Sequence, residues 1–228
     1  MSLLRVFALV NLAAFGLLSH AACSDDSPST GGTGGEGPTP CAAGFLGDPK
    51  GEPQLQVFAW GADGANHDLS DGSTVDLIQP PQGGRVVYVS VRATNVSACG
   101  LTLTGGLRDP DSNQIRFDTR SIALHDTGDG WGEVTSGDLA SYANVPVCHN
   151  LWTDKDIYDT PFTLEATLTD GEGNQATSSF SVVPTCAEPA LLDECLCICE
   201  GGYTLDTVCG AGGAGGGGVG GAGGAGGA

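Results

Sequence analysis

The sequence predicts an all-β protein: an antiparallel sandwich, a small disulfide-rich C-terminal unit and disordered ends. Short runs of alternating apolar and polar residues recur between residues 53 and 184, as in strands that bury one face. Turns rich in Gly, Asp, Asn and Pro separate these runs, which is typical of antiparallel connections. No apolar stripe of helical period and length follows the first 22 residues.

The strands can be assigned in order from these runs. The first is expected at 54–60, and the strongest at 85–93, where Val87, Val89 and Val91 share one face. This strongest strand should lie in the centre of a sheet. A hairpin is expected at 162–183, with its turn at 170–174. Further short strands are expected at 73–79, 101–104, 114–117, 121–124 and around 145–148.

The region from about 53 to 184 resembles the immunoglobulin-like or fibronectin-III-like modules of bacterial surface proteins. The likeness is strongest in the closing segment TLTDGEGNQATSSFSVV. The resemblance implies an immunoglobulin-like sandwich that serves as a binding or structural module.

The N-terminus has the anatomy of a signal peptide. Arg5 precedes an apolar run that is too short for a membrane span, and Ala21 and Ala22 stand directly before Cys23. This stretch resembles the leader of a bacterial lipoprotein, which implies that Cys23 is acylated, for example with palmitate, and becomes the new N-terminus. Ser24 is similar to the residue that follows in lipoproteins sent to an outer membrane. The alternative is a secretory leader cut after Ala21, which would release a soluble chain.

Composition divides the chain into five parts. Residues 1–22 are the signal peptide, and 23–40 form a lipidated Cys and a disordered tether that spans roughly 20 to 25 Å. Residues 41–185 form the sandwich domain, and 186–209 form a Cys-rich unit. Residues 210–228 are a Gly/Ala-rich tail, which should be disordered.

The cysteines predict disulfides. If lipid occupies Cys23, an even set of eight remains: Cys41, Cys99, Cys148, Cys186, Cys195, Cys197, Cys199 and Cys209. Five of these lie in the C-terminal unit and cannot all pair with one another, so one must reach the domain. We expect Cys41 to supply that partner and Cys99 to pair with Cys148. Export favours disulfides over a thiolate metal site for this cluster.

The acidic residues exclude one class of partner and indicate one candidate ion. The chain has 27 acidic against 8 basic residues, which disfavours nucleic-acid binding. Two loops alternate oxygen-bearing side chains, a pattern found in calcium sites and equally in hairpin turns. Their residues are Asp109, Asp111 and Asn113 in one loop and Asp170, Glu172 and Asn174 in the other.

No motif for catalysis is present, because the sequence lacks paired zinc-binding histidines, a G-x-S-x-G elbow and a phosphate-binding loop. Trp60, Trp131 and Trp152 are candidates for sugar stacking or for packing, and Trp131 should be the most exposed. The sequence therefore predicts a non-catalytic envelope lipoprotein without a required cofactor. It would bind the membrane through Cys23 and an envelope protein or polysaccharide through the sandwich. The alternative is a calcium-assisted carbohydrate-binding or adhesion module.

Overall fold

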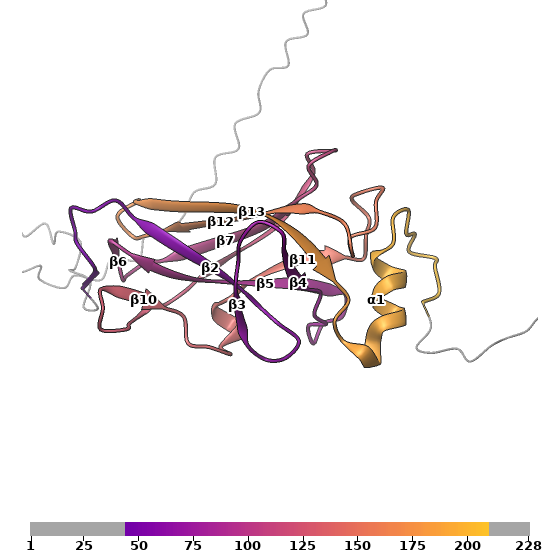
Figure 1. Cartoon of the computed structure of the whole chain (residues 1–228), viewed down its shortest axis with the longest axis horizontal. Helices are drawn as coiled ribbons and strands as arrows, with labels where there is room; N and C mark the ends of the chain where they lie inside the picture. Colours follow the sequence, from indigo (N-terminus) through magenta and orange to yellow (C-terminus); the bar gives the residue numbers. More distant parts are fainter. Residues whose placement is uncertain (1–43, 210–228) are drawn as a thin grey trace, which may run out of the picture. The chain divides into compact units, whose positions relative to one another are not determined.

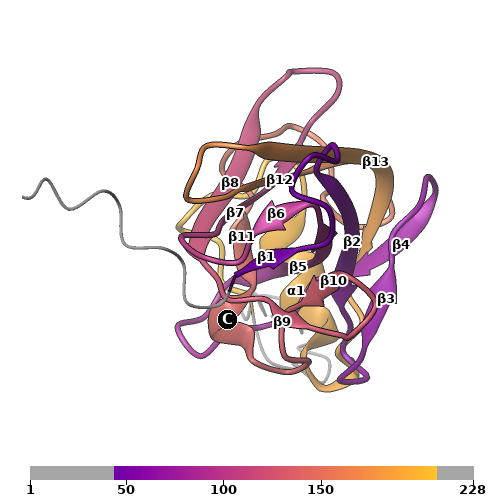
Figure 2. The same ribbon diagram turned by 90° about the vertical axis from the view of Figure 1, so that its left-hand side faces the viewer.

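A computed structural model describes residues 44–209 of the chain, and these fold as an all-β sandwich with a short C-terminal helix (Figures 1 and 2). The first sheet has the order β3 (Asn66–Asp68), β2 (Gln54–Trp60), β5 (Arg85–Thr94), β10 (Trp131–Glu133) and β9 (His125–Asp126), and β11 (Ala143–Cys148) also pairs with β5. The second has the order β4 (Ser73–Asp76), β13 (Gln175–Thr185), β12 (Phe162–Thr169), β7 (Thr102–Arg108) and β8 (Ile115–Ser121). A small separate pair joins β1 (Phe45–Leu46) to β6 (Val96–Ser97).

The strongest predicted strand is central, as expected. One edge of β5 pairs with β2, and the other pairs with β11 and then β10. The closing hairpin is also confirmed, because β12 and β13 pair continuously from Phe162 opposite Val182 to Thr169 opposite Gln175. Most ladders are antiparallel, but β4 pairs with β13 in parallel.

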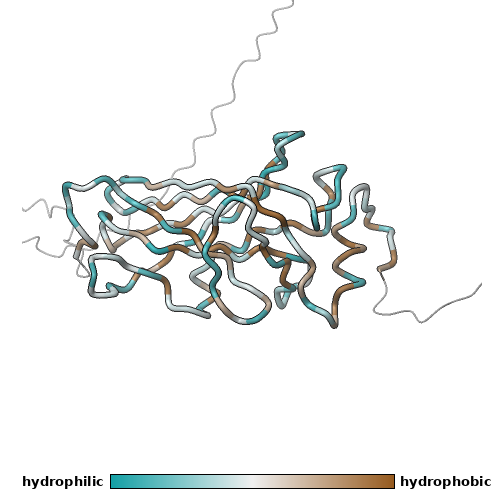
Figure 3. Tube along the Cα trace, viewed as in Figure 1, coloured by the Kyte–Doolittle hydropathy of each residue, from teal (hydrophilic) through white to brown (hydrophobic). Residues whose placement is uncertain are grey.

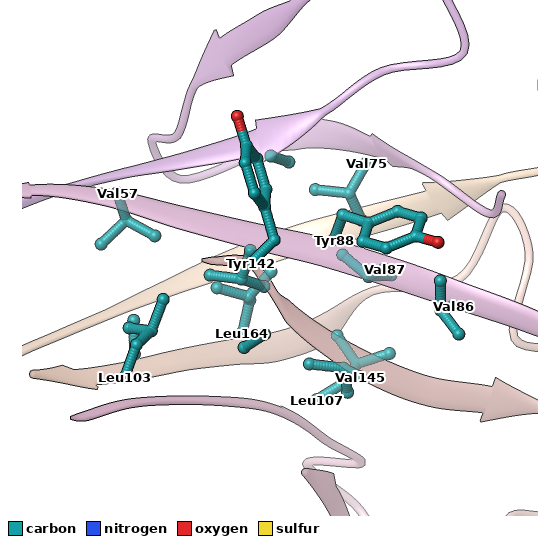
Figure 4. Close-up of a cluster of buried hydrophobic side chains, with 14 of the residues drawn as sticks. Val57, Val75, Val86, Val87, Tyr88, Leu103, Leu107, Tyr142, Val145 and Leu164 are labelled. Carbon is teal, nitrogen blue, oxygen red and sulfur yellow. The ribbon is translucent and has the colours of Figure 1, made fainter. Parts of the chain in front are cut away.

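One core fills the space between the two sheets. Val57 and Val87 of the first sheet meet Leu103, Leu107 and Leu164 of the second, and none of these is more than 3% exposed (Figure 4). Hydrophobic stretches lie along the strands and on the helix, whereas several connecting loops are hydrophilic (Figure 3). Each buried aliphatic side chain contributes roughly 1.5–3 kcal/mol, so this core is the main source of stability.

The sheets approach closely at Gly105 of β7. A Cβ atom there would lie 3.0 Å from the Cβ of Ala143 and 3.2 Å from the Cβ of Val89. Both of these neighbours belong to the opposite sheet, in β11 and β5. Glycine at this position therefore lets β7 pack directly beneath the centre of the first sheet.

The C-terminal unit packs on the end of the sandwich. It contains the 3-10 turn η2 (Pro189–Leu191) and the helix α1 (Leu192–Cys199), and a second 3-10 turn, η1 (Leu139–Ser141), precedes β11. The backbone N–H groups of Asn150 and Ile157 donate to the carbonyls of Ile198 and Cys199, respectively. None of the described helices is long and apolar enough to cross a bilayer.

The disulfide pairing differs from the expectation. Cys148 bonds to Cys199 rather than to Cys99, because β11 ends beneath α1. Cys99 is disulfide-bonded as well. The other bonds within residues 44–209 join Cys186 to Cys195 and Cys197 to Cys209.

All five cysteines of the C-terminal unit therefore have partners among the described residues, and the predicted bond from Cys41 to this unit is wrong. Cys41 itself lies outside the described residues. The same holds for the signal peptide, Cys23, the tether and the Gly/Ala tail.

Candidate functional site

A pocket lies between the free edges of the two sheets. The hairpin of β2 and β3 forms one side, and β4, the edge strand of the other sheet, forms the opposite side (Figure 2). Its volume is about 520 Å³. Its lining includes an indole, an imidazole, three carboxylates and two hydroxyls, but no lysine or arginine: Trp60, His67, Asp63, Asp68, Asp76, Ser73 and Thr74.

An imidazole–carboxylate pair stands at the rim of this pocket. Nε2 of His67 lies 3.0 Å from Oδ1 of Asp63, and both side chains are more than half exposed. The hydrogen bond to Asp63 raises the pKa of His67 despite the opposing effect of partial burial. The same hydrogen bond lowers the pKa of Asp63, so the pair favours an imidazolium beside a carboxylate.

Gly61 leaves room for this arrangement. A Cβ atom at position 61 would lie 2.7 Å from both Oδ1 of Asp63 and Nε2 of His67, so a larger residue there would require these two side-chain ends to shift. The backbone N–H of Ala62 donates to Oδ2 of Asp76 across the pocket at 2.8 Å. The loop after β2 is thus tied to β4.

Packing holds Trp60 at the pocket wall. Its ring meets Tyr142 edge to face, with the ring centroids 6.0 Å apart. Tyr142 is fully buried, and its hydroxyl donates to Oδ1 of Asn66 at 2.9 Å. Trp60 remains partly exposed and lines the pocket, so an indole is held there in a fixed orientation.

A second groove lies between the loop that joins β7 to β8 and the loop that joins β11 to β12. It consists of two adjoining pockets of about 450 and 300 Å³. Both pockets are lined by Gln114, Trp152, Thr153 and Asp154. Lys155 contributes to the larger one, and Tyr203, stacked on His149 with centroids 5.3 Å apart, contributes to the smaller.

The structure brings Asp109 and Asp111 together around an ammonium group. Nζ of Lys155 lies 2.7 Å from Oδ1 of Asp109 and 2.8 Å from Oδ2 of Asp111. Asp109 is buried, and it also accepts hydrogen bonds from Ser112 and Thr153. Burial alone would raise the pKa of Asp109, but these hydrogen bonds outweigh it and hold that pKa far below its usual value.

Asn113 does not join these two carboxylates. Its Oδ1 accepts a hydrogen bond from Nη1 of Arg108 at 3.1 Å, and its φ of 61° marks it as a turn residue. The loop therefore directs two of its three predicted calcium ligands toward a lysine and the third toward an arginine. Within the described residues, each of the three side chains thus has at least one protein donor.

The second predicted calcium loop is a capped turn. Oδ1 of Asp170 accepts from the backbone N–H groups of Glu172 and Asn174, at 3.0 and 2.9 Å. Its Oδ2 accepts from the backbone of Ser97 and from the side-chain amide of Asn174, both at 3.0 Å. Burial again opposes but does not overcome these hydrogen bonds, so the pKa of Asp170 is lowered. The side chain of Asn174 thus directs its amide nitrogen toward Asp170.

Trp131 and Trp152, two of the three candidates for sugar stacking, have different roles. Trp152 is only 5% exposed, and its Nε1 donates to the carbonyl of Val147 at 2.8 Å. Trp131 is partly exposed beneath Arg92, whose guanidinium carbon lies 5.2 Å from the ring centroid. Trp152 is thus a packing residue, and Trp131 and Trp152 do not form an exposed stacking face.

Sequence reasoning assigned no role to Asp63, His67 or Asp76. A weak signal was available in the four-residue spacing of Asp63 and His67, but the approach of β4 was not visible in the sequence. No protein-family model matches this chain, and no curated protein is significantly similar to it.

Proposed function

We propose that this chain is an exported, lipid-anchored protein of the bacterial cell envelope, and that its sandwich acts by binding or as a structural module rather than by catalysis. The observation that carries the proposal is the disulfide content: all seven cysteines within residues 44–209 are disulfide-bonded. Such density is typical of oxidising compartments outside the cytosol.

The N-terminal sequence supports the proposed location in the cell envelope. An apolar leader ends in Ala21-Ala22-Cys23, and the polar segment that follows is long enough to separate a domain from lipid headgroups. A single acyl chain binds a membrane only marginally, so stable anchoring at Cys23 would require at least two chains. The outer membrane is the proposed location, with an envelope protein or polysaccharide as the partner.

Intact mass spectrometry of the protein from its native membrane fraction tests the anchor. We expect a chain that starts at Cys23, carries the mass of two or three acyl chains, and gains eight protons on reduction. Peptide mapping should then join Cys99 to Cys41, the remaining cysteine. A Cys23→Ser variant is the matched control. It should no longer be found in the membrane fraction, but its disulfides should still form. An unlipidated wild-type chain that starts at Ala22 would refute the anchor.

A second candidate function is carbohydrate recognition, and the pocket at Trp60 favours it. A fixed, partly exposed indole beside carboxylates and hydroxyls offers a sugar both a stacking surface and hydrogen-bond partners. The calcium-assisted form of this function has less support, because protein donors already reach both carboxylate oxygens of Asp109 and of Asp170, one in each candidate loop.

Titration with envelope oligosaccharides, followed by calorimetry and tryptophan fluorescence, tests this candidate. A ligand of the pocket should lose its affinity in Trp60→Ala and keep it in Trp131→Phe. Loss of binding in both variants, or in neither, would place the ligand elsewhere. Repeating the titration with a calcium chelator distinguishes calcium-assisted from calcium-independent binding, since only calcium-assisted binding should lose affinity for the oligosaccharide.

A further inference from the structure

The pocket at Trp60 carries negative charge that the fold does not balance. The carboxylates of Asp63, Asp68 and Asp76 line it, and its described lining residues include no lysine or arginine. His67 pairs with Asp63. Asp68 and Asp76 have no ion-pair partner within the part of the chain that the structure describes. Two of the three carboxylate charges are therefore left without a cation of the protein.

The fold holds these two carboxylates in different ways. Oδ2 of Asp76 accepts the backbone N–H of Ala62 at 2.8 Å, and its Oδ1 accepts the hydroxyl of Thr185 at 3.2 Å. These neutral donors fix the position of the carboxylate without cancelling its charge. The side chain of Asp68 is exposed and accepts no hydrogen bond within the described residues. One charge is thus fixed in the pocket wall, and the other can turn toward a ligand.

The imidazole in the pocket shows the sign of the local electrostatic field. The pKa of His67 is raised first by its hydrogen bond to Asp63, and the charges of Asp63 and Asp76 raise it further, against the effect of partial burial. The lining therefore stabilises a positive charge beside it. The same charges would repel an anionic or phosphate-bearing ligand.

The indole of Trp60 adds a flat surface that also favours a cation. Two glycines flank its six-membered ring, because a Cβ atom at Gly64 would lie 3.8 Å from Cζ2 and one at Gly137 would lie 3.5 Å from Cη2. Together with the edge-to-face contact of Tyr142, this backbone limits the movement of the ring. The face of an indole attracts cations and offers a stacking surface to a ring-shaped ligand.

We propose that this pocket binds a sugar that carries a protonated primary amine, as a hexosamine unit with a free amino group does. The inference rests on the carbohydrate-recognition candidate and names its class of sugar. Asp68 and Asp76 would accept charge-assisted hydrogen bonds from the ammonium, and the sugar ring would stack on Trp60. A quaternary ammonium fits less well, because it has no N–H to donate and the described lining offers one aromatic ring rather than a cage.

Calorimetric titration of the full-length protein with three equally linked tetrasaccharides tests the proposal. They are built from glucosamine, N-acetylglucosamine or glucose, and the pH is slightly acidic so that the free amine is protonated. The glucosamine form should bind at least about tenfold more tightly than the other two, the contribution of one hydrogen bond between charged groups. Asp68→Asn should remove most of this preference. Asp206→Asn is the matched control, since it removes an equal charge from an exposed side chain outside the pocket, and it should bind as the wild type does.

Trp60→Ala separates recognition in the pocket from adsorption of a cation to an acidic protein. Adsorption would survive Trp60→Ala and would weaken alike in Asp68→Asn and Asp206→Asn, and that result would overturn the proposal. Equal affinity for the three tetrasaccharides, lost in Trp60→Ala, would overturn the preference for an amine but leave carbohydrate recognition standing. Failure of all three to bind would also overturn the inference, and the titration with envelope oligosaccharides then decides the carbohydrate function separately.

Discussion

Removal of the bond between Cys148 and Cys199 should be the most destabilising loss among the three disulfides within the described residues. The bond closes a loop with a sequence separation of 51 residues, against 9 for Cys186–Cys195 and 12 for Cys197–Cys209. In the chain-entropy model, a disulfide stabilises the folded chain by reducing the entropy of the unfolded chain. For these three loops the stabilisation is about 4.1, about 2.6 and about 2.8 kcal/mol, respectively. Loop entropy alone therefore predicts that losing Cys148–Cys199 lowers the free energy of unfolding by about 1.3 kcal/mol more than losing Cys197–Cys209.

Burial should widen the difference. Cys199 and Cys148 are almost fully buried, so a Cys148→Ala/Cys199→Ala variant also leaves a small cavity at the base of α1, whereas Cys197 and Cys209 are partly exposed. Guanidinium unfolding of the three double-alanine variants measures the order, and the m-value should rise most for the longest loop because the unfolded chain expands. A smaller loss for the Cys148–Cys199 variant than for the Cys186–Cys195 variant would refute the reasoning.

Three further predictions concern the sandwich and its pocket. The pKa values of Asp109 and Asp170 are lowered in the folded state, so the unfolded chain binds more protons than the folded chain as the pH falls through about 4. Urea unfolding should therefore show that the free energy of unfolding decreases as the pH falls through this range. The decrease should be smaller in Asp109→Asn. Gly105→Ala should cost about 1–3 kcal/mol through overpacking. Gly106→Ala should cost less, because its new Cβ meets the flexible end of Ile115; equal losses in chemical denaturation would contradict the close approach of the sheets. The imidazole of His67 should titrate above its usual pKa by NMR and shift down in Asp63→Asn, and an unchanged titration would show that the pair does not form in solution.

Much of the fold could be predicted because its strands carry local signals. The run 85–93 is rich in β-branched residues, and it forms the central strand β5. The hairpin of β12 and β13 follows from two alternating runs around an Asp-Gly-containing turn. The shorter strands β3, β9 and β10 have two or three residues each, and such segments are too short for periodicity to reveal.

The helix and the disulfide pairing could not be predicted for a different reason. Helix α1 has only eight residues, and an isolated helix of that length is unstable in water. Packing on β11 and three of its cysteines hold it in place. The prediction that Cys99 pairs with Cys148 rested only on the order of the cysteines in the chain. The actual partner of Cys148 is Cys199, because the end of β11 lies next to α1 in the fold.

The Asp-rich loops show most clearly where sequence reasoning reaches its limit. Asp109 and Asp170 each accept the backbone N–H of the residue two positions later, and that same two-residue spacing is what calcium loops share with turns. Each loop also receives a donor from elsewhere in the chain. For Asp109 that donor is the ammonium of Lys155, and for Asp170 it is the backbone of Ser97. Lys155 stands in the loop between β11 and β12, and Ser97 in β6. Both donors are therefore far in sequence from the loops that they reach, and the local residue pattern could not reveal them.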